Sequence, residues 1–225
     1  MPKKITASFP DDAALRVAVV GLGGLGCAAL PRMGRWPLAK LSLIDGDRVG
    51  EHNLDNQELY APMDIDAWKA EVSAAWMRQL LPAATIVPHN AFLGAGNAEK
   101  LLAEHDIVLE FTDDLHAKQA IDNACASLAI PLVSAGVHAK QGQVIALHGP
   151  GAGHKLTRKD LFSGRAGGEQ DECDMRNVPL ELLDDVARRA VSLCRSLLLG
   201  EPVVNGRIEL LHKDRWTIID PPVIA

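Results

Sequence analysis

A glycine-rich turn follows a short apolar segment near the start of the chain, where residues 17–26 read V-A-V-V-G-L-G-G-L-G. In such a turn Gly21 permits the tight bend, Gly23 lets a phosphate approach the backbone, and Gly26 lets the next helix pack on the strand. The free N–H groups and the dipole of that helix favour an anion, so the pattern predicts a bound nucleotide. The turn alone does not distinguish NAD, FAD and ATP, and a glycine turn without a ligand is also open.

Further polar residues that could contact a nucleotide lie later in the chain, after predicted strands or at the start of a helix. Asp45 and Asp47 follow the second strand, where a carboxylate can bind ribose hydroxyls, although Asp47 could equally cap the turn. Lys69 begins a helix, and Asp113 ends the fourth strand. A lysine can neutralise phosphate charge and an aspartate can hold Mg²⁺ on a departing pyrophosphate, as nucleotidyl transfer requires. A nicotinamide-dependent oxidoreductase needs neither group, so we rank that alternative last.

Alternating strand and helix patterns must position these residues. Apolar runs predict strands at 15–20, 41–45, 84–88, 106–112 and 131–136. Helical periodicity predicts helices from residue 24 and at about 66–81, 97–104 and 115–128. This alternation predicts an α/β fold with a Rossmann-like, doubly wound, mainly parallel sheet and helices on both faces. Ligands of such sheets gather at the carboxyl ends of the strands, where the polar residues above are expected to meet.

The pattern changes towards the C-terminus. Residues 141–148 predict one more strand, whereas the glycine-rich segment 149–178 lacks apolar periodicity and predicts a mobile crossover loop. A helix is expected from Pro179 to Leu199, followed by a closing hairpin of segments 203–211 and 215–219. We therefore expect a single domain of 225 residues, with its core at about 15–148 and a C-terminal helix and hairpin at about 179–220.

Composition narrows the class of protein. The net charge of −6 and the lack of a long basic run argue against a nucleic-acid partner. No apolar run reaches the roughly 18 residues of a membrane span, and the first residues lack a signal-peptide core, so we expect a cytoplasmic protein with no membrane partner. The four cysteines form no C-x-x-C pair, so neither a disulfide framework nor a zinc site is expected.

The order of several motifs resembles the ThiF/MoeB/HesA family, whose members are related to the ubiquitin-activating enzymes. The motifs are G-L-G-G-L-G at 21–26, D-G-D-R-V-G-E-H-N-L-D-N-Q at 45–57, Lys69, T-D-D-L-H-A-K at 112–118, D-N-A-C at 122–125 and I-P-L-V-S-A-G-V at 130–137. The resemblance covers about residues 15–148, with a weaker echo at 173–200. An ordered series of motifs is far more specific than a glycine loop alone.

The resemblance implies an ATP- and Mg²⁺-dependent adenylyltransferase that works as a homodimer and activates a C-terminal carboxylate. Its substrate would be a ubiquitin-like or sulfur-carrier protein with a Gly-Gly tail. The implied nucleotide contacts are Gly21, Gly23, Gly24 and Gly26 on the loop, Asp45 with Asp47 at the ribose, and Asn53, Gln57 and Lys69 around the phosphates. Asp113 would be the magnesium ligand, and Cys173 would be the thiol that takes part in sulfur transfer.

Three departures from the family pattern keep other functions open. Asn56 stands where relatives carry an arginine, the leading segment of about fourteen residues lacks the usual arginine-bearing helix, and the zinc cysteines are absent. Basic residues that could replace the missing clamps are Arg48, Lys118, Lys155 and Arg158. The alternatives are adenylation of a small-molecule carboxylate and a catalytically weakened nucleotide-binding protein of the same fold.

The cysteines divide into two groups. Cys173 lies in D-E-C-D-M, whose acidic side chains would raise the thiol pKa, so an ordinary loop cysteine is an open alternative to a nucleophile. Cys27, Cys125 and Cys194 lie among apolar neighbours and are expected to be core residues.

Overall fold

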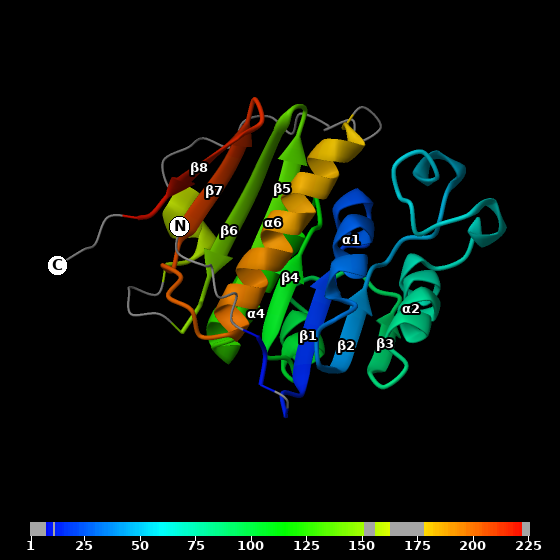
Figure 1. The fold of residues 1–225 in the computed structure, drawn as a ribbon, viewed down its shortest axis with the longest axis horizontal. Helices are drawn as coiled ribbons and strands as arrows, with labels where there is room; N and C mark the ends of the chain where they lie inside the picture. Colours follow the sequence, from blue (N-terminus) through cyan, green and yellow to red (C-terminus); the bar gives the residue numbers. More distant parts are fainter. Residues whose placement is uncertain (1–7, 11, 151–155, 163–177, 222–225) are drawn as a thin grey trace.

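The structure is a computed structural model that describes residues 8–10, 12–150, 156–162 and 178–221. The described residues form one eight-stranded sheet in the order β3-β2-β1-β4-β5-β6-β7-β8 (Figure 1). The parallel strands are β1 (Leu15–Val20), β2 (Leu38–Ile44), β3 (Thr85–His89), β4 (Ile107–Glu110) and β5 (Leu132–His138). The antiparallel strands are β6 (Gln141–Leu147), β7 (Arg207–His212) and β8 (Arg215–Ile219).

Helices cover both faces of the sheet. The α-helices are α1 (Gly24–Ala29), α2 (Lys69–Leu80), α3 (Ala98–Leu102), α4 (Leu115–Leu128), α5 (Arg158–Phe162) and α6 (Leu180–Leu198). Short 3₁₀ turns are η1 (Leu30–Met33), η2 (Glu51–Asn53) and η3 (Pro62–Asp64). The buried residues of α1, α2 and α6 join one hydrophobic core, and those of α3 and α4 join another on the opposite face. The chain is therefore a doubly wound α/β protein.

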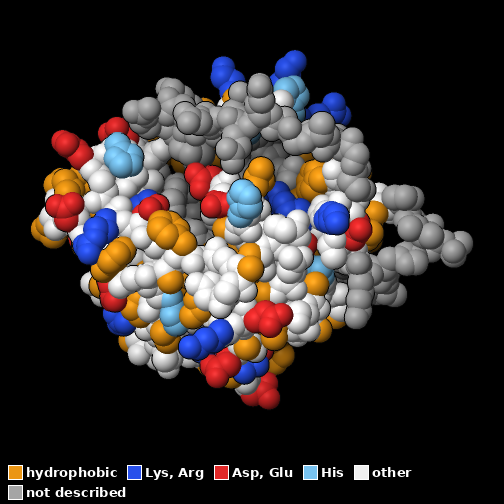
Figure 2. Space-filling model, turned by 180° about the vertical axis from the view of Figure 1, so that it is seen from behind, with side chains coloured by type: hydrophobic (Ala, Val, Ile, Leu, Met, Phe, Trp, Pro, Cys, Tyr) orange, Lys and Arg blue, Asp and Glu red, His pale blue; other side chains and the backbone are white. Residues whose placement is uncertain are grey.

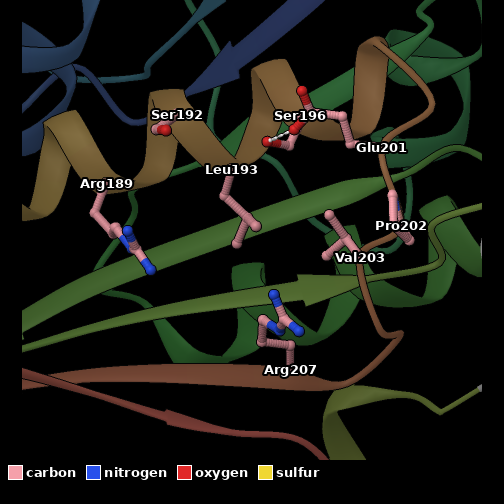
Figure 3. Close-up of a pocket in the computed structure, with 8 residues that line it drawn as sticks. All are labelled: Arg189, Ser192, Leu193, Ser196, Glu201, Pro202, Val203 and Arg207. Atoms are coloured by element: carbon pink, nitrogen blue, oxygen red, sulfur yellow. Dashed lines mark hydrogen bonds between the residues drawn. The ribbon is translucent and has the colours of Figure 1, made fainter. Parts of the chain in front are cut away.

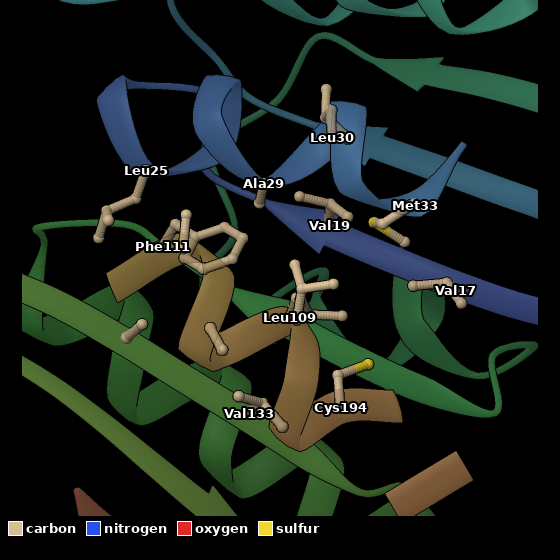
Figure 4. Packing of buried hydrophobic residues seen from close by; sticks show 14 of the residues in the cluster. Val17, Val19, Leu25, Ala29, Leu30, Met33, Leu109, Phe111, Val133 and Cys194 are labelled. Atoms are coloured by element: carbon tan, nitrogen blue, oxygen red, sulfur yellow. The ribbon is translucent and has the colours of Figure 1, made fainter. Parts of the chain in front are cut away.

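Strand β1 shows why the sequence folds this way. Val17 and Val19 point to the core beneath α1 and α6, and Ala18 and Val20 point to the core beneath α4. Figure 4 shows the first of these cores, where Val17, Val19 and Leu109 from neighbouring strands meet side chains of α1 and α6. A strand buried on both faces reads as a continuous apolar run, which is what residues 17–20 show.

The fold class and most predicted elements are confirmed, with shifted boundaries. Strand β2 begins at Leu38 rather than 41, and helix α2 begins at Lys69 rather than about 66. The expectation of a loop without an element after β6 is wrong at residues 158–162, where α5 packs against α4. Helix α5 is too short for apolar periodicity to reveal it. Within the described parts, no helix has the length and apolar character needed to cross a membrane.

Candidate functional site

The glycine turn between β1 and α1 is shaped by three different requirements. Gly21 has φ +87°, and a Cβ added there would lie 2.7 Å from the Thr112 nitrogen. A Cβ added at Gly26 would lie 2.2 Å from the Gly21 oxygen, so both positions need glycine for the protein's own packing. Apart from its own chain neighbours, a Cβ added at Gly23 would meet no atom of the described residues within 4 Å. The space in front of Gly23 is open, which is the requirement for a phosphate close to the backbone.

Two side chains hold the Leu22 peptide groups inside this turn. The Leu22 N–H donates to Asp45 Oδ2 at 2.7 Å, and the Tyr60 hydroxyl donates to the Leu22 oxygen at 2.8 Å. The other Asp45 oxygen accepts the N–H of Asp47 at 2.8 Å. Burial raises the pKa of Asp45, and the two backbone N–H groups and Lys69 oppose that shift. Asp45, which the sequence suggests as a ribose contact, therefore also fixes the glycine turn to the end of β2.

Lys69 and Asp47 meet beside this turn. Lys69 is the first residue of α2 and only 6% exposed, and its Nζ lies 3.4 Å from Asp47 Oδ2. The Lys69 N–H also donates to the Asp47 oxygen at 3.0 Å. An ammonium has three donors, so one long contact with Asp47 leaves capacity for an anionic ligand. The structure thus brings a buried cation to the end of β2.

The segment of η2 and the residues after it lies against the start of α1. A Cβ added at Gly24 would lie 3.5 Å from the Asn56 backbone oxygen. Asn53 uses Oδ1 to accept the Gly50 N–H at 2.9 Å. Gln57 is 8% exposed, and its Oε1 has no hydrogen-bond partner among the described residues. A buried amide with an unpaired end costs about 1–3 kcal/mol, so Gln57 is a natural ligand contact. Turning the amide over would present its NH₂ group to a phosphate.

Two adjacent carboxylates follow β4 and have different surroundings. Asp114 caps α4 by accepting the N–H groups of His116 at 2.7 Å and Ala117 at 3.1 Å, and these bonds lower its pKa. Asp113 is exposed and makes no hydrogen bond or ion pair with the residues that the structure describes. Thr112, next to Asp113, is the residue that abuts Gly21. The turn that carries Asp113 is therefore in contact with the glycine turn.

The donor set suits Mg²⁺ better than a protein-enclosed metal site. No cluster of three or more His, Cys, Asp or Glu side chains in the described ranges could hold a metal ion. Mg²⁺ is usually bound by one or two carboxylates together with substrate phosphates. Asp113, which is exposed and makes no hydrogen bond or ion pair among the described residues beside the glycine turn, has a donor group that fits that arrangement.

Comparison with known proteins places the chain. The ThiF family matches residues 12–219. The chain belongs to the ThiF family. It is 35% identical over 129 residues to the molybdopterin-synthase adenylyltransferase of Escherichia coli, and the matched residues are 57% of this chain and 52% of that protein. It is 36% identical over 135 residues to the adenylyltransferase and sulfurtransferase uba4 of Aspergillus clavatus, covering 60% of this chain and 27% of that protein. The chain thus spans about half the length, or less, of these relatives.

Solved structures show the same fold. E. coli MccB, determined with AMPCPP and MccA, matches with a TM-score of 0.75 at 15% identity, covering 93% of this chain and 64% of that chain. TcdA (CsdL) matches with a TM-score of 0.54 at 25% identity, covering 58% of this chain and 56% of that chain. The family and the fold expected from the order of motifs are both confirmed.

The basic residues that could replace the absent ThiF-family arginines have other contacts. Lys118 is buried and donates to both Glu110 carboxylate oxygens, at 2.8 and 2.9 Å, so it is not available as a phosphate clamp. The Arg48 guanidinium lies 3.9 Å from the centre of the Trp68 ring. Arg158 donates to Ser134 Oγ at 3.1 Å. Lys155 lies outside the described residues, so its suggested role stays a prediction.

The cysteines expected in the core are there. Cys27, Cys125 and Cys194 are all buried, and burial raises each thiol pKa, to about 12 for Cys27. Thiols with raised pKa values are poor nucleophiles at neutral pH. Cys173 lies outside the described residues, so its role as the transfer thiol stays a prediction.

Sequence reasoning missed Tyr60 and Glu110. Tyr60, which holds the Leu22 oxygen, is the one tyrosine of the chain, and nothing in its neighbourhood marks its partner. Glu110 carried a usable signal, because it is a carboxylate at the end of the apolar run I-V-L-E and is 1% exposed. A charged residue in a buried strand calls for a buried partner.

Other surface features do not extend this site. A hollow of about 190 Å³ lies between α6 and β7, and Arg189, Leu193, Val203 and Arg207 are among the residues that line it (Figure 3). Arg189 is paired with Glu209, and Arg207 with Asp220, so neither cation is free for an anionic ligand. On the face shown in Figure 2, the acidic and basic side chains of the described residues are interspersed rather than gathered by sign.

Proposed function

We propose that this chain is an ATP- and Mg²⁺-dependent adenylyltransferase that activates the C-terminal carboxylate of a ubiquitin-like or sulfur-carrier protein ending in Gly-Gly. The observation that carries the proposal is the open space in front of Gly23, at a turn that Asn56, next to Gln57, and Thr112, next to Asp113, both approach. Asp45 fixes that turn through the Leu22 N–H and also accepts the N–H of Asp47, the residue that lies 3.4 Å from Lys69. Membership of the ThiF family and the names of the two relatives support adenylation as the reaction.

In the proposed reaction a carboxylate oxygen of the substrate attacks the α-phosphorus of ATP. The bond between that phosphorus and the bridging oxygen breaks, and pyrophosphate leaves with the electron pair. Backbone N–H groups at the start of α1 hold the phosphates, and Lys69 stabilises the negative charge that grows on the leaving group. Because Lys69 is 6% exposed, its charge acts in a medium less polarisable than water, where it is worth more.

Asp113 would hold Mg²⁺, and the ion supplies charge neutralisation on the leaving pyrophosphate. Asp45 and Asp47 would bind the ribose hydroxyls, with Asp45 keeping its bond to the Leu22 N–H. Asn53 and Gln57 would contact the phosphates through their amide nitrogens. The Cys173 thiol would then attack the acyl carbonyl of the adenylate, forming a thioester and losing its proton as AMP leaves. A homodimer is part of the same proposal and is supported by the family resemblance alone; a cytoplasmic location, expected from the composition of the sequence, is also part of the proposal.

The test is pyrophosphate exchange into ATP, driven by a Gly-Gly-tailed carrier protein. Wild type should exchange label only when the carboxylate is present. Lys69→Met should slow exchange about 10²- to 10³-fold, the usual cost of removing one charge-stabilising group. Lys40→Met is the matched control, because Lys40 pairs with Glu104 near the start of β2, at the opposite end of that strand from Asp45.

The outcomes separate the alternatives. Exchange that requires a small-molecule carboxylate rather than the carrier would replace the proposed substrate with that class. Binding of ATP without exchange by any carboxylate would instead indicate a nucleotide-binding protein that has lost catalysis. Exchange unaffected by Lys69→Met would contradict the assignment of Lys69.

A further inference from the structure

A connected set of polar side chains, here called the Glu110 network, joins four elements of the fold next to the turn that carries Asp113. Its members are Glu110 of β4, Lys118 of α4, Ser134 of β5 and Arg158 of α5. Glu110 is 1% exposed and accepts two bonds from Lys118 Nζ, at 2.8 and 2.9 Å. The Ser134 hydroxyl donates to Glu110 Oε2 at 2.6 Å, and Lys118 Nζ also donates to the Ala135 oxygen at 3.3 Å. Every charged end in this network is therefore bonded.

The network reaches the crossover segment through α5. Arg158 donates from its guanidinium to Ser134 Oγ at 3.1 Å, and its backbone N–H donates to Asp122 Oδ2 at 2.8 Å. Asp122 is fully buried in α4 and lies 2.7 Å from His148 Nε2, just beyond the end of β6. Helix α5 is thus held by two partly buried hydrogen bonds, one to α4 and one to β5, as well as by the packing of its apolar side chains.

The ion pair between Glu110 and Lys118 bears on the candidate site because its two residues flank the turn 111–114 in the sequence. Glu110 is the last residue of β4, and Lys118 lies one turn into α4, so their bonds span the turn 111–114 from both ends. That turn carries Asp113, and its residue Thr112 abuts Gly21. Asp114 fixes the start of α4, whereas Asp113 makes no hydrogen bond or ion pair of its own among the described residues and acts on Lys118 only through its charge. The position of Asp113 therefore depends on how the ends of the turn are held.

Stability alone is a weak reason for such a pair. Taking two charges out of water costs free energy, and apolar residues of similar size are often as stable or more stable at such places. Burial lowers the pKa of Lys118, while Glu110 opposes that shift. A fixed geometry is the advantage that a multiply bonded ion pair has over apolar packing, because each bond constrains direction as well as distance.

We propose that the Glu110 network positions Asp113 for metal-bound ATP, and that Arg158 ties the crossover segment into the same constraint. Glu110, Lys118, Ser134 and Arg158 are positioning residues, since they act through the turn and do not touch the ligand. The inference rests on the proposed function, because it assumes that Asp113 meets Mg²⁺ on ATP.

The test measures ATP affinity by calorimetry with Mg²⁺ and, separately, with EDTA. In Glu110→Gln the gain in affinity on adding Mg²⁺ should fall about tenfold, the scale of effect seen when support behind a metal ligand is lost. Affinity in EDTA should stay within twofold of wild type, because the glycine turn is unchanged. A purely structural role would lower the melting temperature without changing this ratio.

Glu209→Gln is the matched control. Glu209 is also 1% exposed and also bonded to a cation, Arg189, but it lies in β7 away from the turn. It should lower the melting temperature and leave the Mg²⁺ ratio at the wild-type value. Lys118→Arg keeps a charged donor for Glu110 and should keep most of the ratio. Ser134→Ala removes one hydrogen bond, retains the ion pair and should reduce the ratio about threefold, so it serves if Glu110→Gln does not fold.

Different results would contradict the proposed function and the positioning role. If wild type gains no affinity for ATP on adding Mg²⁺, the proposed function is wrong and this inference goes with it. If wild type gains affinity while Glu110→Gln and Ser134→Ala keep the full ratio, the positioning role is wrong and the proposed function stands. An equal change in Glu209→Gln would also overturn the positioning role.

Discussion

Asp113 and Asp114 are adjacent in the chain, yet the structure gives them separate work. Asp114 caps α4, so Asp114→Ala should lower the free energy of unfolding by about 1 kcal/mol, the usual cost of losing a helix cap. Asp113→Ala removes no hydrogen bond or ion pair among the described residues and only a longer-range charge interaction with Lys118, so it should change stability little and weaken binding of Mg²⁺ and ATP together. Urea unfolding and calorimetry on the two variants check this prediction. Loss of stability in Asp113→Ala would contradict it.

The pH dependence of the Asp114 contribution follows from the lowered pKa. The N–H groups of Ala117 and His116 hold the folded pKa of Asp114 below 3.8, its value when unperturbed. The stabilisation is therefore complete above pH 3.8 and is lost as the pH falls through the lower folded value. Wild type and Asp114→Ala should differ in unfolding free energy at pH 7 and converge in acid. A difference that grows in acid would show that the carboxylate is not the cap.

Residue types and spacing predicted where in the fold the candidate residues lie, because strand ends and helix starts have local signals. The glycines follow β1 and Asp113 follows β4, two strands that apolar runs reveal, and Lys69 begins α2. Partners are harder to predict, since they depend on side-chain direction across elements. Lys118 is a candidate clamp from its place at the end of the T-D-D-L-H-A-K motif, yet Glu110, eight residues earlier in sequence, accepts its hydrogen bonds from the strand end. The bond from the Leu22 N–H to Asp45 needs the three-dimensional turn in the same way.

At the scale of the element, the turn into α1 contains two glycines that the fold requires, Gly21 and Gly26, and one, Gly23, that packing does not require and that we propose faces the phosphates. Gly26→Ala places a methyl 2.2 Å from the Gly21 oxygen, so it should cost at least about 2 kcal/mol of stability. Gly23→Ala places its methyl in open space and should leave stability unchanged. It should weaken ATP binding by about 1–3 kcal/mol, the cost of forcing a methyl into space that a phosphate fills. Thermal melts with and without ATP distinguish the two variants. Equal destabilisation by Gly23→Ala and Gly26→Ala would contradict this prediction.

Element boundaries were least predictable where tertiary contacts set them. Helix α5 spans only Arg158–Phe162, and its anchor is a backbone bond from Arg158 to Asp122, which no local pattern in 149–178 encodes. Strand β7 begins at Arg207 rather than 203, because its ladder starts where β6 offers Ala146 as a partner. Propensity predicts that a segment can be a strand, and pairing decides where it begins.

At the scale of the molecule, burial on both faces made the sheet predictable. The apolar runs of β1 and β4 predict strands at the centre of the sheet, buried on both faces. The helices that pack on the two faces bury them. The same burial distributes the cysteines: Cys194 lies in the core under α6, Cys125 in the core under α4, and Cys27 in a small core with Val49 and Tyr60. Each of these three hydrophobic cores therefore contains a cysteine whose reactivity shows when that core opens.

This distribution gives a test of the expected single domain. If the described residues unfold as one unit, Cys125 and Cys194 should react with a thiol reagent at the same slow rate, set by global opening, although they lie on opposite faces of the sheet. Cys27, whose thiol pKa burial raises to about 12, should be no faster. Rapid labelling of Cys173 in the folded protein would support the transfer role proposed for it. A Cys125 that reacts well before Cys194 would show that the α4 face opens by itself, and the chain would then not behave as one cooperative domain.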